Sequence, residues 1–527
     1  MIGRRTLLAA GAATTLAGPR LARAQPGRIL RFVPQADLPN LDPVAGTQLV
    51  VANGSRLVYD TLYGIGADFV ARPQMCAGHE LSDDSRIWTF VLRPDLRFHD
   101  GEPVLAKDAV ASIARWMRRD SMGQILQARL DTVEVLDDRR FRLRLKQPFP
   151  QLLYAFAKPR SNMLAIMPAR IAELDAFKVV PEYIGSGPMR FRRDEWVAGS
   201  RAVFERFDAY SPRPEPADWL AGGKRVLVDR VEWITMPDAA TAANALVSGE
   251  IDWWESPVSD LMPLLEGRRG IRTGIADPLG NLGILRLNHL HPPFNDVRAR
   301  RALQMAVDQE DYMRAVAGDD PAMWKRLPSF FTPGTPYYTE EGGEVLRGPR
   351  RLDEARRLLA EAGYGGERVV LLVATDVAIT KAQGEVTADL MRRLGLNVDF
   401  QSLDWGTVGS RRANKGPPEQ GGWHAFHTWN PGSGCVTPAG YSQLDATGDK
   451  AWFGWPRDEA VQARIADWYA ATDEAGAKQA MGALNRASMR AVTSIPTGFF
   501  MTKMAWRQEV QGVISAPFPC FWGIGKG

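Results

Sequence analysis

Two helix-like and two strand-like patterns alternate between residues 350 and 403, and this alternation limits the folds open to the chain. The first helical pattern begins with acidic residues and ends at Gly363, a typical C-terminal cap. Its apolar positions, spaced for one helical face, are Leu352, Ala355, Leu358, Leu359 and Ala362. The run ERVVLLVATD, a helical segment at 380–394 and the strand pattern NVDFQSL follow. We therefore expect a sheet covered by helices.

An earlier part of the chain contains strand and helix patterns of another kind. A His-Asp-Gly turn at 99–101 precedes apolar residues at helical spacing, which predicts a strand, a turn and a helix. The stretch RFRLRLKQPF alternates Phe141, Leu143 and Leu145 with basic residues, as in a strand with one face in water. The fold class is thus mixed α/β.

The first 24 residues are typical of a cleavable export signal. Arg4 and Arg5 precede a short run of small and apolar residues, which closes on Ala22-Arg23-Ala24. This run is too short for a transmembrane helix, and we expect cleavage after Ala24. The arginine pair favours a twin-arginine signal, and the alternative is a general secretory signal that contains two arginines. Either signal places the mature protein outside the cytoplasm, in the periplasm.

The export signal also accounts for the charge of the chain. Its net charge is +4, and the first 24 residues hold four arginines and no acidic residue, so the remainder is neutral. A basic, nucleic-acid-binding protein is therefore not expected. The chain has three cysteines, too few for a disulfide scaffold, and at least one must be unpaired. About 500 mature residues predict two or more domains.

Four blocks of the sequence form a pattern that extends over most of the chain. The first block runs from LVYDTLYG to the Phe-His-Asp-Gly-x-Pro turn FHDGEP. The others are GSGPMRF, LVSGEIDWW and LRLNHLHPPFNDVRARRALQMAVDQ. In this order they resemble the extracellular solute-binding proteins of family 5, the periplasmic dipeptide-, oligopeptide- and nickel-binding receptors. We interpret most of these residues as turns, caps and packing positions, so they indicate the family and leave the ligand open.

The resemblance implies a two-lobed periplasmic binding protein (type II, cluster C) that closes around its ligand by hinge motion. The first lobe would be discontinuous, comprising residues 25–278 and 493–527, with an extra subdomain inserted at about 45–180. The second lobe would comprise 279–492. The expected crossovers between the lobes are Leu285–Asn288 and Ile495–Phe500.

The function that the resemblance implies is that of a monomeric receptor of an ABC importer, without cofactor or metal, which delivers a solute to a membrane permease. One alternative is a secreted hydrolase, although no nucleophile motif is present and paired carboxylates would meet only in the fold. Another is a nickel or metal-chelate receptor, because His424 and His427 lie near Cys435. Two histidines three residues apart in a strand would, however, point to opposite faces.

The ligand site is expected in part at the stretch GGWHAFHTWNPGSG. Peptide-binding relatives carry a segment Trp-x-x-Asp-Tyr-x-Asp-Pro whose aspartate meets the peptide ammonium group. Here Trp429, Asn430 and Pro431 stand at that place, and the amide of Asn430 cannot neutralise a cation. Asp404 or Asp376 could take the role from a neighbouring loop.

An aromatic wall is the second expected part of the site. Trp423, Phe426 and Trp429 recur every three residues, with His427 between them, and could stack on a ring, a sugar or a cation. The alternative is that two of these three rings belong to the lobe core. Trp405 would add a further side. On the first lobe, Asp37 and Asn40 are candidate contacts, unless they only form a turn.

Overall fold

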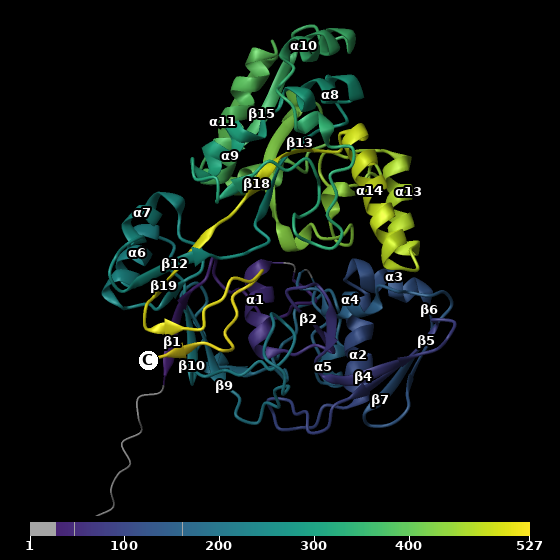
Figure 1. The fold of residues 1–527 in the computed structure, drawn as a ribbon, viewed down its shortest axis with the longest axis vertical. Coiled ribbons are helices and arrows are strands. Elements are labelled where there is room, and N and C mark those ends of the chain that lie inside the picture. Colours follow the sequence, from purple (N-terminus) through teal and green to yellow (C-terminus); the bar gives the residue numbers. More distant parts are fainter. Residues whose placement is uncertain (1–27, 47, 161) are drawn as a thin grey trace, which may run out of the picture.

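The computed structural model describes residues 28–46, 48–160 and 162–527, which form two lobes and a subdomain (Figure 1). The expected export signal, 1–24, and its cleavage site lie outside the described residues. Each lobe is built on its own large sheet, and the subdomain on a smaller one. Within the described residues, no helix is long and apolar enough to cross a membrane.

The first lobe is built on a seven-stranded sheet. Its central strand β1 pairs in parallel with β10 and β11, and the remaining strands pair antiparallel. In spatial order the strands are β12 (Ile271–Ile275), β19 (Lys503–Arg507), β11 (Trp253–Trp254), β1 (Ile29–Val33), β10 (Arg230–Ile234), β9 (Arg201–Arg206) and β8 (Met189–Phe191). Its helices are α1 (Leu49–Val58), α5 (Ala169–Ala172), α6 (Ala239–Ser248) and α7 (Met262–Leu265).

The subdomain is an antiparallel sheet packed against helices. Its strands, in spatial order, are β4 (Cys76–Leu81), β5 (Ile87–Leu92), β7 (Arg140–Leu145) and β6 (Leu130–Val135). Its helices are α2 (Ala106–Met117), α3 (Ser121–Arg129) and α4 (Leu152–Ala157). In β7, Phe141, Leu143 and Leu145 are buried while their neighbours are not, which confirms the predicted one-sided strand. The helix predicted after the turn at 99–101 is α2.

The second lobe is built on a six-stranded sheet that contains the predicted strand–helix–strand unit. Its strands, in spatial order, are β14 (Trp324–Lys325), β18 (Ile495–Phe500), β13 (Asn281–Leu287), β17 (Ala425–Pro431), β15 (Arg368–Ala374) and β16 (Asn397–Leu403). Its helices are α8 (Val297–Ala306), α9 (Gln309–Ala317), α10 (Leu352–Glu361), α11 (Ala378–Arg393), α12 (Trp405–Arg411), α13 (Glu459–Ala470) and α14 (Glu474–Ala491). Parallel pairing of β15 with β16, joined by α11, confirms the prediction.

Two short segments carry the chain between the large sheets. Residues 276–280 join β12 of the first lobe to β13 of the second, and residues 501–502 join β18 to β19 in the return direction. The expected crossovers, Leu285–Asn288 and Ile495–Phe500, instead lie largely within β13 and β18, which pair with each other in the second lobe. Two two-stranded ribbons, β2 (Tyr63–Ile65) with β3 (Ala71–Pro73) and β20 (Val510–Gln511) with β21 (Gly525–Lys526), complete the fold.

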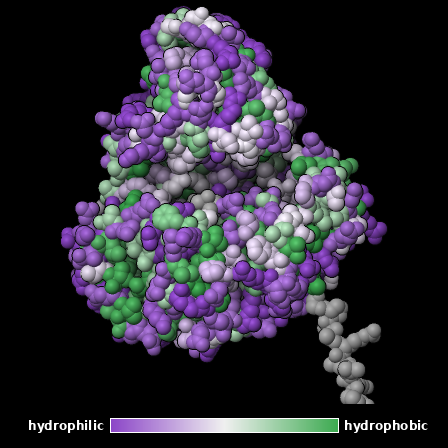
Figure 2. Space-filling model, turned by 180° about the vertical axis from the view of Figure 1, so that it is seen from behind, coloured by the Kyte–Doolittle hydropathy of each residue, from purple (hydrophilic) through white to green (hydrophobic). Residues whose placement is uncertain are grey.

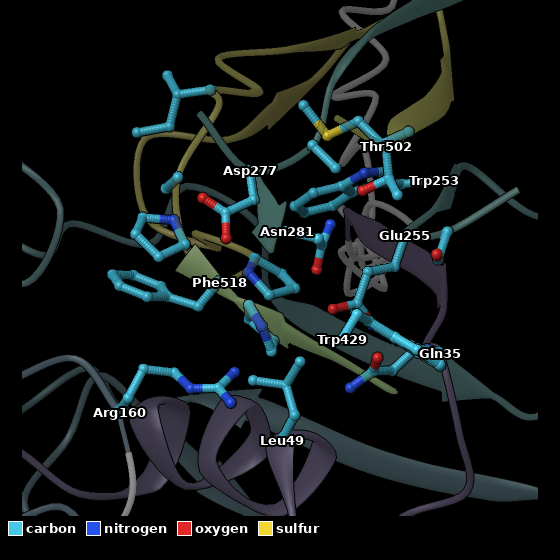
Figure 3. Close-up of a pocket in the computed structure, with 18 of the residues that line it drawn as sticks. Gln35, Leu49, Arg160, Trp253, Glu255, Asp277, Asn281, Trp429, Thr502 and Phe518 are labelled. Atoms are coloured by element: carbon cyan, nitrogen blue, oxygen red, sulfur yellow. Dashed lines mark hydrogen bonds between the residues drawn. The ribbon is translucent and has the colours of Figure 1, made fainter. Parts of the chain in front are cut away.

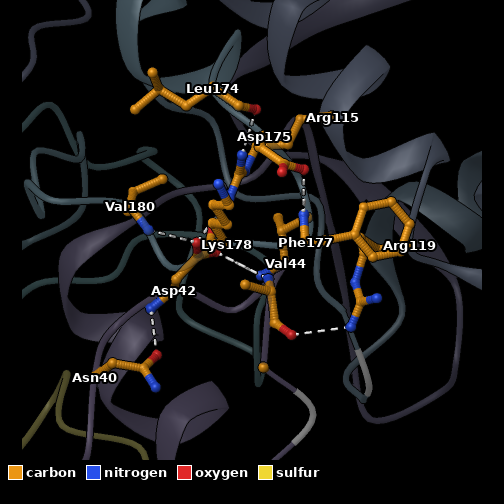
Figure 4. A network of polar contacts seen from close by, with 12 residues as sticks. Asn40, Asp42, Val44, Arg115, Arg119, Leu174, Asp175, Phe177, Lys178 and Val180 are labelled. Atoms are coloured by element: carbon orange, nitrogen blue, oxygen red, sulfur yellow. Dashed lines mark hydrogen bonds and ion pairs between the residues drawn. The ribbon is translucent and has the colours of Figure 1, made fainter.

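A buried ion pair fixes the subdomain helix α2 to the first lobe (Figure 4). Arg115 of α2 donates to Asp42 at 2.8 Å, and both side chains are at most 1% exposed. Arg115 also donates to the carbonyls of Leu174 and Lys178 at 2.7 and 2.9 Å, and Asp42 accepts from the Val180 N–H at 3.0 Å. Both charges therefore have several partners, as burial of an ion pair requires.

The three cysteines do not tie the lobes together. Cys76, Cys435 and Cys520 are all buried and free, and they belong to the subdomain, the second lobe and the C-terminal segment of the first lobe. Burial raises the pKa of each thiol, to about 12 for Cys435 and Cys520, so the reactive thiolate is disfavoured.

Candidate functional site

A pocket of about 180 Å³ lies between the two lobes, beside both connecting segments (Figure 3). The molecule is hollowed along a groove between the lobes (Figure 2). The first lobe contributes Trp253 and Glu255 from the end of β11, together with the C-terminal segment around Phe518. The second lobe contributes Asn281 and Trp429. A pocket between two domains that is walled by both is a common place for a small ligand.

Glu255 is a desolvated carboxylate at the pocket wall. Its Oε2 accepts from the backbone N–H of Gln35 at 2.8 Å, and its Oε1 accepts from Nδ2 of Asn53 at 3.0 Å. Burial raises the pKa of Glu255 to about 7, although these hydrogen bonds and the charge of Arg56 act in the opposite direction. The ionised form is therefore costly in this position, and a cation placed in the pocket would stabilise it.

Arg160 is a charged group of the opposite sign whose guanidinium has no hydrogen-bond acceptor among the described residues. Its Nη1 is buried. Burial lowers the pKa of Arg160, against the attraction of Asp277 and Cys435. A buried guanidinium without an acceptor is unfavourable by several kcal/mol. This side chain is therefore suited to bind an anionic group.

Asp277 is the third charged residue of the pocket, and it lies on the segment that connects the lobes. Its Oδ1 accepts from the Leu279 N–H at 2.8 Å. Burial raises the pKa of Asp277 to about 6, although the Leu279 hydrogen bond and Arg160 oppose this shift. In Figure 3, Asp277 and Arg160 lie on one side of the pocket and Glu255 lies with Gln35 on the other. The pocket thus has charged groups at both ends.

Aromatic and apolar side chains form the walls between these charges. Trp253 and Phe518 come from the first lobe, and Trp429 faces them from the end of β17. The ring of Trp429 packs at 6.1 Å from that of Trp405, measured between centroids. The pocket therefore combines ring surfaces with the separated charges of Glu255 and Arg160.

The expected aromatic wall is divided between the pocket and the core. Trp423 and Phe426 are 0% exposed and pack with Val370, Leu372 and Trp455 inside the second lobe. Neither ring lines the pocket, which agrees with the alternative that two of the three rings are core. Of β17, Trp429 and Pro431 line the pocket, at the end of the strand that is only partly buried. The roles of Trp429 and Trp405 in ligand binding stay predictions.

The two histidines of this stretch are held by the second lobe. Nδ1 of His424 accepts from the Val370 N–H at 2.8 Å, and Nε2 of His427 lies 2.7 Å from Oγ1 of Thr387. Burial lowers the pKa of His424 to about 4 and that of His427 to about 3. Neither lines the pocket. Within the described part of the chain, no group of three or more His, Cys, Asp or Glu is arranged to hold a metal ion.

The remaining predicted residues do not line the pocket, and their side chains make other hydrogen bonds. Oδ1 of Asn430 accepts from Gln443 at 2.8 Å. On the first lobe, Asp37 accepts from Oγ1 of Thr235 at 3.1 Å, and Asn40 accepts from the Asp42 N–H at 3.0 Å. A turn-forming role therefore accounts for the Asn40 side chain.

The two acidic residues suggested as replacements for the missing aspartate lie beside Trp405. Asp404 caps α12 by accepting from the Thr407 N–H at 2.8 Å, and Oδ1 of Asp376 accepts from the Trp405 N–H at 2.9 Å. Neither is among the residues that line the pocket. The carboxylates that do line it are Glu255 and Asp277, which the sequence did not single out.

The family model of the bacterial extracellular solute-binding proteins, family 5, matches residues 71–443. The chain belongs to this family. A probable peptide ABC transporter periplasmic-binding protein of Sinorhizobium fredii is 35% identical over 100% of this chain and 99% of its own length. The periplasmic oligopeptide-binding protein OppA of Escherichia coli is 24% identical over 80% of this chain and 81% of its own length.

Solved structures of the family share the two-lobed fold. The dipeptide-binding protein of Pseudoalteromonas sp. SM9913, in complex with Met-Leu, matches with a TM-score of 0.74 at 17% identity and covers 95% of this chain and 100% of its own. AgaA of A. tumefaciens, in complex with agropinic acid, matches with a TM-score of 0.76 at 19% identity and covers 95% of this chain and 99% of its own. The protein is thus a two-lobed, family 5 solute-binding protein.

Proposed function

We propose that this family 5 protein is the periplasmic receptor of an ABC importer, and that its ligand is a small zwitterionic solute of the peptide type. The relatives named as peptide transporters support the class of ligand, and the pocket supports its charge pattern. The partner would be a membrane permease with its ATPase. We propose no enzymatic turnover, since the family is one of substrate-binding transport proteins.

The unpartnered guanidinium of Arg160 is the observation that carries this proposal. A ligand carboxylate would give Arg160 the acceptor that the described residues do not provide. A charge-assisted, bidentate contact of this kind is among the stronger hydrogen-bonded interactions. At the other side of the pocket, Glu255 would meet the ammonium group and be stabilised in its ionised form.

Among the described residues, the charged groups that line the pocket come from the first lobe, its subdomain or the connecting segment. The described side chains that the second lobe contributes are uncharged, among them Asn281, Ile379 and Trp429. The ammonium site proposed here therefore lies on Glu255 of the first lobe, whereas the second lobe contributes an aromatic and polar cover. This arrangement accounts for Asn430 at the position of the relatives' aspartate.

Native mass spectrometry of periplasmic protein, followed by denaturation, would identify the solute that is released. We expect a short peptide or a similar zwitterion. Calorimetry with that solute and with its N-acetylated and C-amidated forms should show that blocking either charge weakens binding at least tenfold. Release of a neutral sugar, or equal binding of the blocked forms, would refute the charge assignment.

Three variants test which charged residue of the pocket binds which charged group of the solute. Arg160→Met should abolish the preference of the protein for solutes with a free carboxylate. Glu255→Gln should abolish its preference for solutes with a free ammonium group. Asp277→Asn is the matched control, because it removes a second pocket carboxylate from the side where Arg160 lies. If Asp277→Asn alone removes the ammonium preference, the cation binds Asp277 instead. Turnover of the solute that is lost in Glu255→Gln would favour the hydrolase alternative.

A further inference from the structure

A second contact between the lobes lies on the far side of the cleft from both connecting segments. There, the subdomain elements α3 and α4 meet the C-terminal end of α13 of the second lobe (Figure 1). The connecting segments 276–280 and 501–502 lie at the opposite side of the molecule, beside β12 and β19. Any hinge opening about these segments must separate this contact.

Two side chains of the subdomain make this contact through backbone carbonyls. Nη2 of Arg129 donates to the carbonyl of Tyr469 at 3.0 Å. Nε2 of Gln151 donates to the carbonyls of Trp468 and Ala471, both at 3.3 Å. All three acceptors belong to the last turn of α13 or follow it directly. The Trp468 carbonyl also accepts from the Ala471 N–H at 3.3 Å, whereas most carbonyls at a helix C-terminus depend on partners outside the helix.

The charge of Arg129 suits this position. The C-terminus of a helix carries partial negative charge, which a cation stabilises. Within the described residues Arg129 forms no ion pair with a carboxylate; its Nη1 donates to the Pro148 carbonyl at 2.8 Å, and its guanidinium lies over the Phe149 ring. The guanidinium thus bridges one carbonyl of the subdomain and one of the second lobe.

Apolar packing accompanies these hydrogen bonds. Buried side chains of the subdomain and of the second lobe, including Leu152 and Trp468, belong to one continuous cluster. The seven-stranded sheet of the first lobe has a separate core. The subdomain is therefore linked to both lobes, by the Asp42–Arg115 pair to the first and by this contact to the second.

We infer that Arg129 and Gln151 form a latch that holds the second lobe in the closed position and thereby raises affinity for the solute without touching it. They are positioning residues, since neither lines the pocket that contains Arg160 and Glu255. Because the latch joins protein to protein, it acts whichever solute is bound. It therefore also favours closure of the solute-free protein.

Small-angle X-ray scattering on solute-stripped protein tests the latch directly. Arg129→Met keeps most of the apolar stem and removes the charge, and Gln151→Met removes the amide at similar length. Arg139→Met, at an exposed arginine of the same subdomain, is the matched control. Thermal unfolding and circular dichroism would check that each variant is folded.

We expect the radius of gyration to rise in each single variant and further in the double variant, with Arg139→Met unchanged. Since a hydrogen bond from a charged group is worth roughly a factor of ten or more, the ratio of open to closed protein should rise about tenfold in Arg129→Met and less in Gln151→Met, which removes a neutral donor. Unchanged scattering of a folded double variant would overturn the inference. If Arg129→Met does not fold, Gln151→Met decides alone, because unchanged scattering there would also overturn it.

Discussion

Replacing Glu255 with glutamine should stabilise the solute-free protein at pH 8 and change its stability little at pH 5. Burial raises the pKa of Glu255 from 4.5 to about 7 in the folded protein. The folded state therefore retains a proton that the unfolded state has lost, so the wild type loses stability as the pH rises from about 4.5 through 7. The variant has no such group to ionise.

The loss of stability can be calculated from the shift in the pKa of Glu255. A change from 4.5 to about 7 corresponds to about 3 kcal/mol of lost stability at pH 8, and to about 1 kcal/mol or less at pH 5. For a lobe of this size, about 1 kcal/mol moves the melting temperature by roughly 2–4 °C. The difference in melting temperature between the variant and the wild type should therefore be roughly 5 °C larger at pH 8 than at pH 5.

Differential scanning calorimetry of solute-stripped protein at the two pH values measures this gain. Glu250→Gln, at an exposed glutamate five residues earlier, is the control and should show no pH-dependent difference. A melting difference between Glu255→Gln and wild type that is equal at pH 5 and pH 8 would refute the reasoning, because it would mean that the Glu255 carboxylate is not desolvated.

The remaining predictions concern the aromatic residues, the pH dependence of binding and the mature terminus. Trp429→Ala should weaken solute binding at least tenfold with little change in the free energy of unfolding, and calorimetry that finds equal binding would exclude Trp429 from the site. Trp423→Ala should instead destabilise the fold by about 3–5 kcal/mol, because it empties a core position. Affinity for a cationic solute should rise as the pH increases towards 7 and Glu255 ionises, and a flat titration profile would contradict this. Edman sequencing of periplasmic protein should begin at Gln25, and another first residue would move the predicted cleavage site.

Local periodicity allowed the strand–helix–strand unit of the second lobe to be predicted from sequence. The apolar pattern that begins at Leu352 corresponds to α10, β15, α11 and β16, in which the helices bury one stripe each and β15 is buried on both faces. The positions of the crossovers were predicted less accurately, because a strand pattern does not show to which sheet the strand belongs. The chain changes sheet before β13 and after β18, a few residues from the expected positions.

The pocket residues could be predicted only in part. Sequence spacing identified the stretch that contains Trp429, but it could not show that exposure depends on position along β17. This strand is buried at Ala425 and half-buried from Trp429 to Pro431. Arg160, Glu255 and Asp277 are single charged residues in three separate segments, and only the topology brings them to one pocket. No local pattern marked any of them as buried.

The connecting segments themselves form part of the pocket wall, at Asp277 and Thr502. When one body rotates against another, displacement grows with distance from the axis. A solute seated here lies close to that axis, so its contacts with these segments change little in length during rotation, whereas contacts at the rim change most. The solute can therefore contact the connecting segments before the lobes close and keep these contacts during closure.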